Sequence, residues 1–140
     1  MRAFGSAESP TTGNMDPTVC ARKLAAFVKN NSLDGVDVNY QDNVAFNNAI
    51  AENWLISFTN TLRDLLPFHI LSHTIQDYYL DRSKYIGGSY TKVISTIGNL
   101  LDFYSINYYG QQNTAYTTYT ELFENSGAEF SNSSVSQLVA

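Results

Sequence analysis

Leu33-Asp34-Gly35-Val36-Asp37-Val38-Asn39-Tyr40-Gln41-Asp42 is the stretch that decides the fold of this 140-residue chain. Successive side chains of a β-strand point to opposite faces, so Asp37, Asn39 and Gln41 share one face, which also carries Gly35. The opposite face carries apolar side chains that suit packing against covering helices, namely Val36, Val38 and Tyr40. The polar row is therefore expected to line an interior or a site that handles a substrate.

The rest of the chain alternates predicted strands with predicted helices. Short apolar runs predict three further strands, at residues 2–5, 69–74 and 101–109. Helices are predicted at 17–30, where Asp16 can cap a helix that begins with Pro17, and between Ala51 and the helix-stopping Pro67. Shorter helices are predicted at 94–100 and 114–124, and another begins within 135–140. Strands that alternate with helices predict a parallel sheet.

Apolar periodicity predicts which faces of the two longer helices are buried. In the first helix the repeating apolar positions are Cys20, Leu24, Phe27 and Val28. In the second helix they are Ala51, Trp54, Leu55, Phe58, Leu62 and Leu65. Between the later strands, residues 78–88 are aromatic and contain glycine, which predicts a long loop over the strand ends.

The segment from Asp34 to Gln41 resembles the catalytic strand of glycoside hydrolase family 18, the chitinases and endo-β-N-acetylglucosaminidases, whose pattern is D-x-x-D-x-D-x-E. The resemblance implies a (β/α)8 barrel, also called a TIM barrel. A complete barrel needs about 200 residues or more. The 140 residues are therefore expected to form one α/β domain, residues 1–140, that is a partial barrel. It would contain about strands three to six, as a parallel sheet with outer helices.

The resemblance also implies roles for the polar row. In the family, the terminal Glu protonates the glycosidic oxygen, and the middle Asp orients the substrate's N-acetyl group, whose oxygen is the nucleophile. Gln41 stands at the position of that Glu, and Asn39 replaces the Asp before it. Asp37 matches the orienting Asp, and Asp34 matches the first acid of the pattern. An amide has no titrating proton to deliver, and general acid catalysis contributes roughly 10²- to 10⁴-fold to a rate, so we predict binding without measurable hydrolysis.

Further candidate residues follow the later predicted strands. In Asn107-Tyr108-Tyr109-Gly110, Tyr109 matches a family Tyr that hydrogen-bonds the acetyl carbonyl of the substrate, with Asn107 beside it in the substrate site. Gln76 matches a polar position near the end of the family's fifth strand. Tyr78 and Tyr79 come just beyond it and are suited to stacking on a sugar ring. The alternative for each Tyr is an ordinary half-buried aromatic side chain.

Composition and charge exclude several classes of function. The formal net charge of −5, without a Lys/Arg cluster, argues against nucleic-acid binding. No apolar run approaches the ~18 residues of a membrane span, and no secretory signal is visible, which leaves the compartment unassigned. Cys20 is the only cysteine, so no internal disulfide is expected. His69 and His73 would lie roughly 13 Å apart on a strand, too far to share a metal, and neither a metal nor a cofactor is expected.

Three functional hypotheses follow from these residues. The first is an inactive family 18 module that binds N-acetylglucosamine-containing glycans, such as chitin oligosaccharides or an N-glycan core. The second is an enzyme with residual activity. The third is a truncated barrel or structural protein that self-associates, because a half barrel would leave Gly35, Ser72, Phe103 and Ser105 facing solvent or the second subunit of a homodimer.

Overall fold

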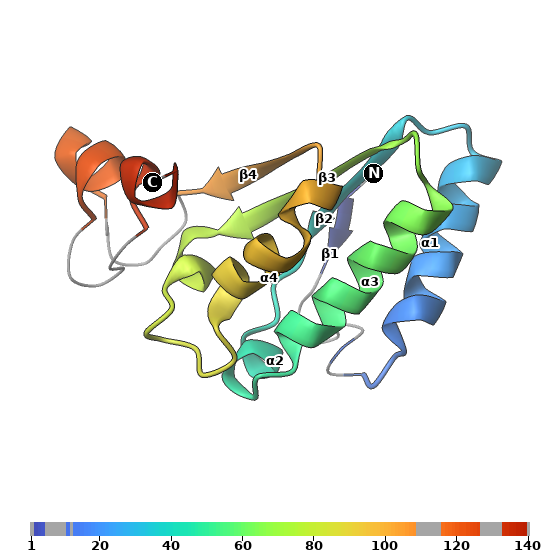
Figure 1. The fold of residues 1–140 in the computed structure, drawn as a ribbon, viewed down its shortest axis with the longest axis horizontal. Helices are drawn as coiled ribbons and strands as arrows, with labels where there is room; N and C mark the ends of the chain where they lie inside the picture. Colours follow the sequence, from blue (N-terminus) through green and yellow to red (C-terminus); the bar gives the residue numbers. More distant parts are fainter. Residues whose placement is uncertain (1, 5–10, 12, 109–115, 127–132, 140) are drawn as a thin grey trace.

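A four-stranded parallel sheet forms the centre of the molecule in the computed structural model, which describes residues 2–4, 11, 13–108, 116–126 and 133–139. The strands stand side by side in sequence order (Figure 1): β1 (Arg2–Phe4), β2 (Gly35–Asn39), β3 (Ile70–Gln76) and β4 (Phe103–Asn107). All four predicted strands are therefore confirmed. Strands in this order, joined by helical connections, are typical of βα-barrel architecture.

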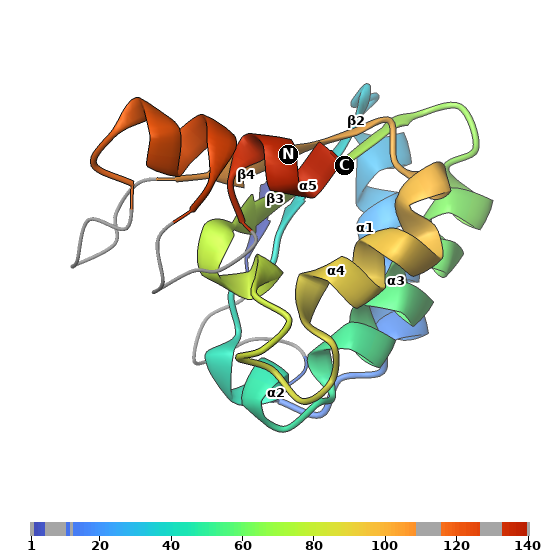
Figure 2. The same ribbon diagram turned by 60° about the vertical axis from the view of Figure 1, so that its left-hand side comes forward.

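Three helices cover one face of the sheet: α1 (Pro17–Asn30), α3 (Ala51–Leu65) and α4 (Ser89–Ile97). Figure 2 shows all three on the same side of the strands. Shorter elements are α2 (Asn43–Asn47), the 3₁₀ turns η1 (Asp77–Leu80) and η2 (Gly98–Leu100), the π-helical turn η3 (Thr120–Glu124) and α5 (Val135–Val139). None of the described helices is long and apolar enough to span a bilayer.

The boundaries of α1 follow the sequence signals. Asp16 Oδ1 accepts hydrogen bonds from the backbone N–H groups of Thr18, at 2.8 Å, and Val19, at 3.0 Å, and Pro17 is the first helical residue. The buried face differs in part from the prediction, because Phe27 is 48% exposed while Ala21 and Ala25 are buried. α1 packs against α3, and the small buried alanine side chains permit a close approach of helices.

The structure corrects two other predicted helices and adds one that was not predicted. The helix predicted at 94–100 begins earlier, at Ser89, and ends in the η2 turn. The helix predicted at 114–124 is a short π-helical turn where it is described, and residues 114–115 lie outside the described part. The helix α2 was missed, although Asp42 caps it by accepting a hydrogen bond from the Ala45 N–H at 2.9 Å.

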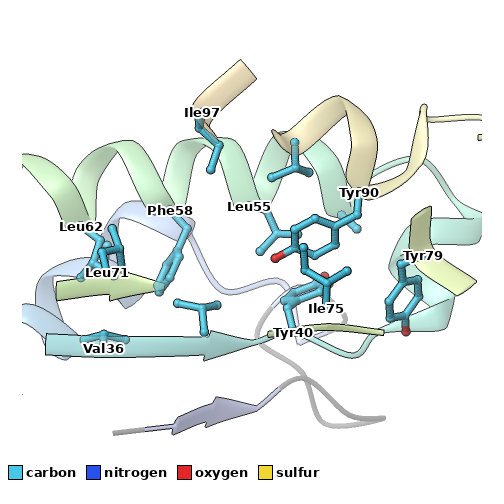
Figure 3. Close-up of a cluster of buried hydrophobic side chains, with 14 of the residues drawn as sticks. Val36, Tyr40, Leu55, Phe58, Leu62, Leu71, Ile75, Tyr79, Tyr90 and Ile97 are labelled. Carbon is cyan, nitrogen blue, oxygen red and sulfur yellow. The ribbon is translucent and has the colours of Figure 1, made fainter. Parts of the chain in front are cut away.

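The hydrophobic core lies between the sheet and the three helices (Figure 3). Strand side chains meet the helices at Val36, Leu71 and Ile75, all of which are at most 2% exposed. The facing helical side chains include Leu55, Phe58 and Leu62 of α3 and Tyr90 and Ile97 of α4. The core face of the sheet thus consists of the side chains that the alternation of β2 placed there, as predicted.

Two buried polar side chains, His73 and Glu52, form hydrogen bonds between elements of this core. His73 of β3 is fully buried, with Nδ1 2.6 Å from the Tyr90 hydroxyl and Nε2 3.2 Å from the Thr59 hydroxyl. Burial lowers the pKa of His73 from 6.5 to about 3. Glu52, in the first turn of α3, is also fully buried, and its Oε1 accepts a hydrogen bond from the Ser89 N–H, at the start of α4.

A single arginine links the amino ends of β3 and β4. The Arg63 guanidinium donates hydrogen bonds to the carbonyl oxygens of His69, at 2.9 Å, and Leu100, at 2.8 Å. It also pairs with Asp102 at 2.8 Å, and the same carboxylate oxygen accepts from the Leu71 N–H. These bonds hold the pKa of Asp102 below its usual value, the Leu71 N–H contributing most.

Candidate functional site

The polar row of β2 lies on the face of the sheet that points away from α1, α3 and α4, which we call the open face. Its side chains are Gly35, Asp37 and Asn39 of β2, Ile70, Ser72, Thr74 and Gln76 of β3, and Phe103, Ser105 and Asn107 of β4. The strand register aligns them in rows, with Asp37 beside Ser72, Asn39 beside Thr74, and Gln76 beside Asn107. The open face is therefore apolar near the amino ends of the strands and polar near their carboxyl ends.

Asp37 is held by two hydroxyl groups of the neighbouring strand. The Ser72 hydroxyl donates to Asp37 Oδ1 at 2.8 Å, and the Thr74 hydroxyl lies 2.8 Å from Oδ2 and 3.0 Å from Oδ1. The sequence analysis missed this clamp, although the alternation of β3 places both hydroxyls on one face. Ser72 is only 3% exposed, so the expectation that it faces solvent or a partner is wrong.

Gln41 and Asn39 are joined at the carboxyl end of β2. Gln41 Nε2 donates a hydrogen bond to Asn39 Oδ1 at 2.9 Å, and Asn39 is only 1% exposed. Asp42 follows directly and caps α2, which fixes the backbone on the far side of Gln41. The two amides that replace acids of the family pattern are thus brought together.

Tyr40 anchors this end of β2 from the opposite face. Its ring packs at 5.8 Å from both Phe46 and Trp54, and its hydroxyl donates to Thr11 at 2.7 Å. Trp54 packs on Phe58 and donates its indole N–H to the Met15 carbonyl oxygen, which agrees with its predicted core position. The residues on either side of Tyr40 are therefore held on the open face.

Asp34 lies apart from Asn39 and Gln41, and it lines the same shallow hollow as Asp37. It is exposed and precedes the first residue of β2, whereas Gln41 follows the last. Seven residues of extended chain separate the two, a span of about 23 Å. Asp34 and Gln41 therefore lie at opposite ends of β2, and the Asp34 carbonyl oxygen accepts a hydrogen bond from the Ile70 N–H.

The remaining predicted residues lie at or beyond the carboxyl ends of β3 and β4 in the sequence. Gln76 and Asn107 are neighbours at the carboxyl ends of β3 and β4, and Asn107 is 8% exposed.

Tyr78 is half-buried on η1, and the Lys84 ammonium lies 5.5 Å from its ring centre. Burial raises the pKa of the Tyr78 hydroxyl. Tyr79 is fully buried against Phe46, so the prediction that it stacks on a sugar is wrong. Tyr109 lies outside the described residues.

A cluster beyond the strand ends was not predicted. Tyr108 packs edge-on against Tyr116 at 4.9 Å and donates its hydroxyl to the Ser133 carbonyl oxygen at 3.0 Å. Burial raises the pKa of Tyr108 to about 12, and the negative charge of buried Asp77 adds to the shift. The members of this cluster, Tyr108, Tyr116 and Ser133, are distant in sequence, so no local sequence pattern could have predicted it. Within the described part of the chain, no group of three or more His, Cys, Asp or Glu side chains could hold a metal ion.

Comparison with known proteins supports this arrangement at the level of the fold. No protein-family model and no curated protein matches the chain. Among solved structures, the chain is similar to a GH18 chitinase from Pseudoalteromonas aurantia, with 36% sequence identity and a TM-score of 0.65. The fold is GH18-like. The match covers 73% of this GH18-like chain and 38% of the chitinase chain, so it spans well under half the length of that protein.

The similarity to the chitinase extends to the architecture of the sheet and helices. The α/β arrangement with a parallel sheet and surrounding helices is consistent with part of a TIM barrel of the GH18 type, as the motif strand predicted. Chitinase activity is a property of the Pseudoalteromonas protein, of which this chain matches a part.

Proposed function

We propose that this GH18-like chain binds glycans containing N-acetylglucosamine without hydrolysing them. The observation that carries the proposal is the side chain at the acid position of the motif, Gln41, which is hydrogen-bonded to Asn39. A carboxylic acid must lose a proton to the leaving oxygen, and a carboxamide has none to give near neutral pH. The Asn39 amide likewise carries no negative charge with which to stabilise a developing positive charge on the sugar.

The same residues favour recognition of a neutral, hydrogen-bonding ligand. Gln41, just beyond β2, and Gln76, at the carboxyl end of β3, are partly exposed amides, and Asn107 lies beside Gln76 at the end of β4; such groups both donate and accept. Strand ends are where βα-barrel proteins bind their ligands. Sugars carry several hydroxyl groups that donate and accept, which suits such a lining.

Asp37 is suited to hold the acetamido group. A carboxylate has about four lone-pair sites, and the Ser72 and Thr74 hydroxyls supply two donors to it. Among the described residues, Oδ2 accepts a hydrogen bond from the Thr74 hydroxyl, and a carboxylate oxygen with one such donor keeps capacity for the N–H of an acetamido group. The clamp also fixes the carboxylate before a ligand arrives, which reduces the ordering cost of binding.

Calorimetric titration with chitin oligosaccharides tests the binding half of the proposal. We expect saturable binding by the wild type and weaker binding by Asp37→Ala. Asp34→Ala is the matched control, because Asp34 belongs to the same motif but is exposed and precedes the first residue of β2. Equal affinity of all three proteins, or no binding by the folded wild type, would contradict the proposal.

Release of a fluorogenic group from an N-acetylglucosamine oligomer tests the hydrolytic half. We expect no turnover by the wild type, and the enzymatic range begins at about 1 per second. The double variant Asn39→Asp with Gln41→Glu restores both acids of the family pattern and is expected to exceed either single variant. Turnover by the wild type in the enzymatic range would instead favour an active glycosidase.

A further inference from the structure

A cavity of about 320 Å³ lies on the helix-covered side of β4, away from the open face. Tyr104 and Ile106 of β4 line this cavity, and they alternate along the strand with Phe103, Ser105 and Asn107, which belong to the open face. Its volume is at the small end of the range of about 300 to 1,000 Å³ that is usual for small-molecule sites. The cavity is therefore separate from the candidate glycan site.

Segments that are distant in sequence form the walls of this cavity. Each of four elements, η1, α4, β4 and α5, contributes one apolar side chain, in chain order Leu80, Ile94, Ile106 and Leu138. All four belong to the hydrophobic core or pack against it. The α5 wall is held by Gln137, whose Oε1 accepts hydrogen bonds from the hydroxyls of Ser126, at 2.9 Å, and Ser134, at 2.8 Å. The cavity thus has apolar walls that packing and hydrogen bonds keep in place.

Arg82 supplies the charge of the cavity. Of the described residues that line it, only Arg82 carries a formal charge. Arg82 Nε donates a hydrogen bond to the Thr91 hydroxyl oxygen at 3.0 Å, and this hydroxyl donates to the Gly88 carbonyl oxygen at 3.0 Å. Within the described part of the chain, the guanidinium forms no ion pair and no second hydrogen bond. Its two terminal amino groups therefore keep their donors, in the geometry that matches the two oxygens of a carboxylate.

We propose that this cavity binds a small organic carboxylate with an apolar body. The carboxylate pairs with the two terminal amino groups of Arg82, and the apolar body lies between Ile94, Ile106 and Leu138. The Tyr104 ring in the wall suits a body that is itself a planar ring. A cation is repelled by Arg82, and a neutral molecule lacks the charged hydrogen bonds. Because the cavity lies on the other side of the sheet from Asp37, the proposal does not depend on glycan binding.

Titration of the isotope-labelled protein with benzoate, followed by NMR, tests the proposal. We expect saturable shifts of the backbone amide signals of Thr91, Tyr104 and Leu138, with a dissociation constant in the millimolar range that suits so small a ligand. Benzamide has the ring without the charge and should bind at least about tenfold more weakly. Acetate has the charge without the ring and should also bind at least about tenfold more weakly. The absence of saturable shifts, or equal affinity for benzoate and either analogue, would overturn the proposal.

Two substitutions in the cavity separate its charge from its space. Arg82→Gln removes the charge and should weaken benzoate binding at least about tenfold. The matched control is Arg22→Gln, because Arg22 is exposed on α1, which does not line the cavity. Ser95→Phe keeps the charge but places a ring in the cavity, so it should abolish binding. Arg82 and Ser95 are both exposed, so neither change is expected to prevent folding. Wild-type affinity in either cavity variant, or an equal loss in Arg22→Gln, would contradict the assignment.

Discussion

Lowering the pH from 7.5 to 5 should destabilise the native protein through one buried side chain, His73. Its pKa is lowered from 6.5 to about 3 by burial, so the folded protein holds this imidazole neutral throughout that interval. The unfolded chain takes up a proton as the pH falls below 6.5, and the folded chain does not. Unfolding is therefore favoured increasingly toward acid, and the stability contributed by neutral His73 is present above pH 6.5 and lost toward pH 3.

The magnitude follows from the width of the interval. From 6.5 to 5 is 1.5 pH units, and each unit corresponds to about 1.36 kcal/mol when one proton is bound by the unfolded state alone. The expected loss is about 2 kcal/mol, a large part of the marginal stability of a small domain. The carboxylates with lowered pKa, such as Asp102, lose their contributions at more acidic pH and hardly affect this interval.

Urea denaturation at a series of pH values measures the effect. His73→Gln should be less stable at pH 7.5, because the bonds to Thr59 and Tyr90 are disturbed, but its stability should change little between pH 7.5 and 5. The control is His69→Gln, which alters the only other histidine, leaves His73 in place and should therefore retain the loss of stability that His73 produces. The reasoning fails if wild-type stability is the same at both pH values, or if His73→Gln retains the full slope.

Two further predictions concern packing and the amino ends of the strands. Gly87→Ala should lower the free energy of unfolding by about 1 to 3 kcal/mol, because a Cβ there would overlap the buried Glu52 carboxylate. Gly98→Ala should change it little, because its Cβ would meet only Ile94 Cγ2 at an ordinary 3.5 Å, and thermal unfolding of the pair compares them. Arg63→Lys should cost about 1 to 3 kcal/mol in urea denaturation, because one ammonium cannot reach the carbonyls of His69 and Leu100 together with the Asp102 carboxylate. Full stability of this variant would show that the guanidinium bonds contribute nothing.

Local patterns predicted the elements of this fold better than the contacts between them. The alternation from Gly35 to Gln41 identified both faces of β2, because a strand's side-chain period does not depend on its neighbours. The clamp on Asp37 requires the register of β2 with β3, which pairs residues 35 positions apart. Tyr79 was misplaced for the same reason, since its burial depends on stacking with Phe46 of a helix that the sequence analysis missed.

The arginine link between β3 and β4 has an evolutionary consequence. Arg63 secures the amino ends of two strands, whereas Asn39, Gln41, Gln76 and Asn107 stand at or beyond the carboxyl ends. Substitutions at the carboxyl ends therefore leave the Arg63 hydrogen bonds unchanged. The function of this end of the sheet can change during evolution while the fold is kept.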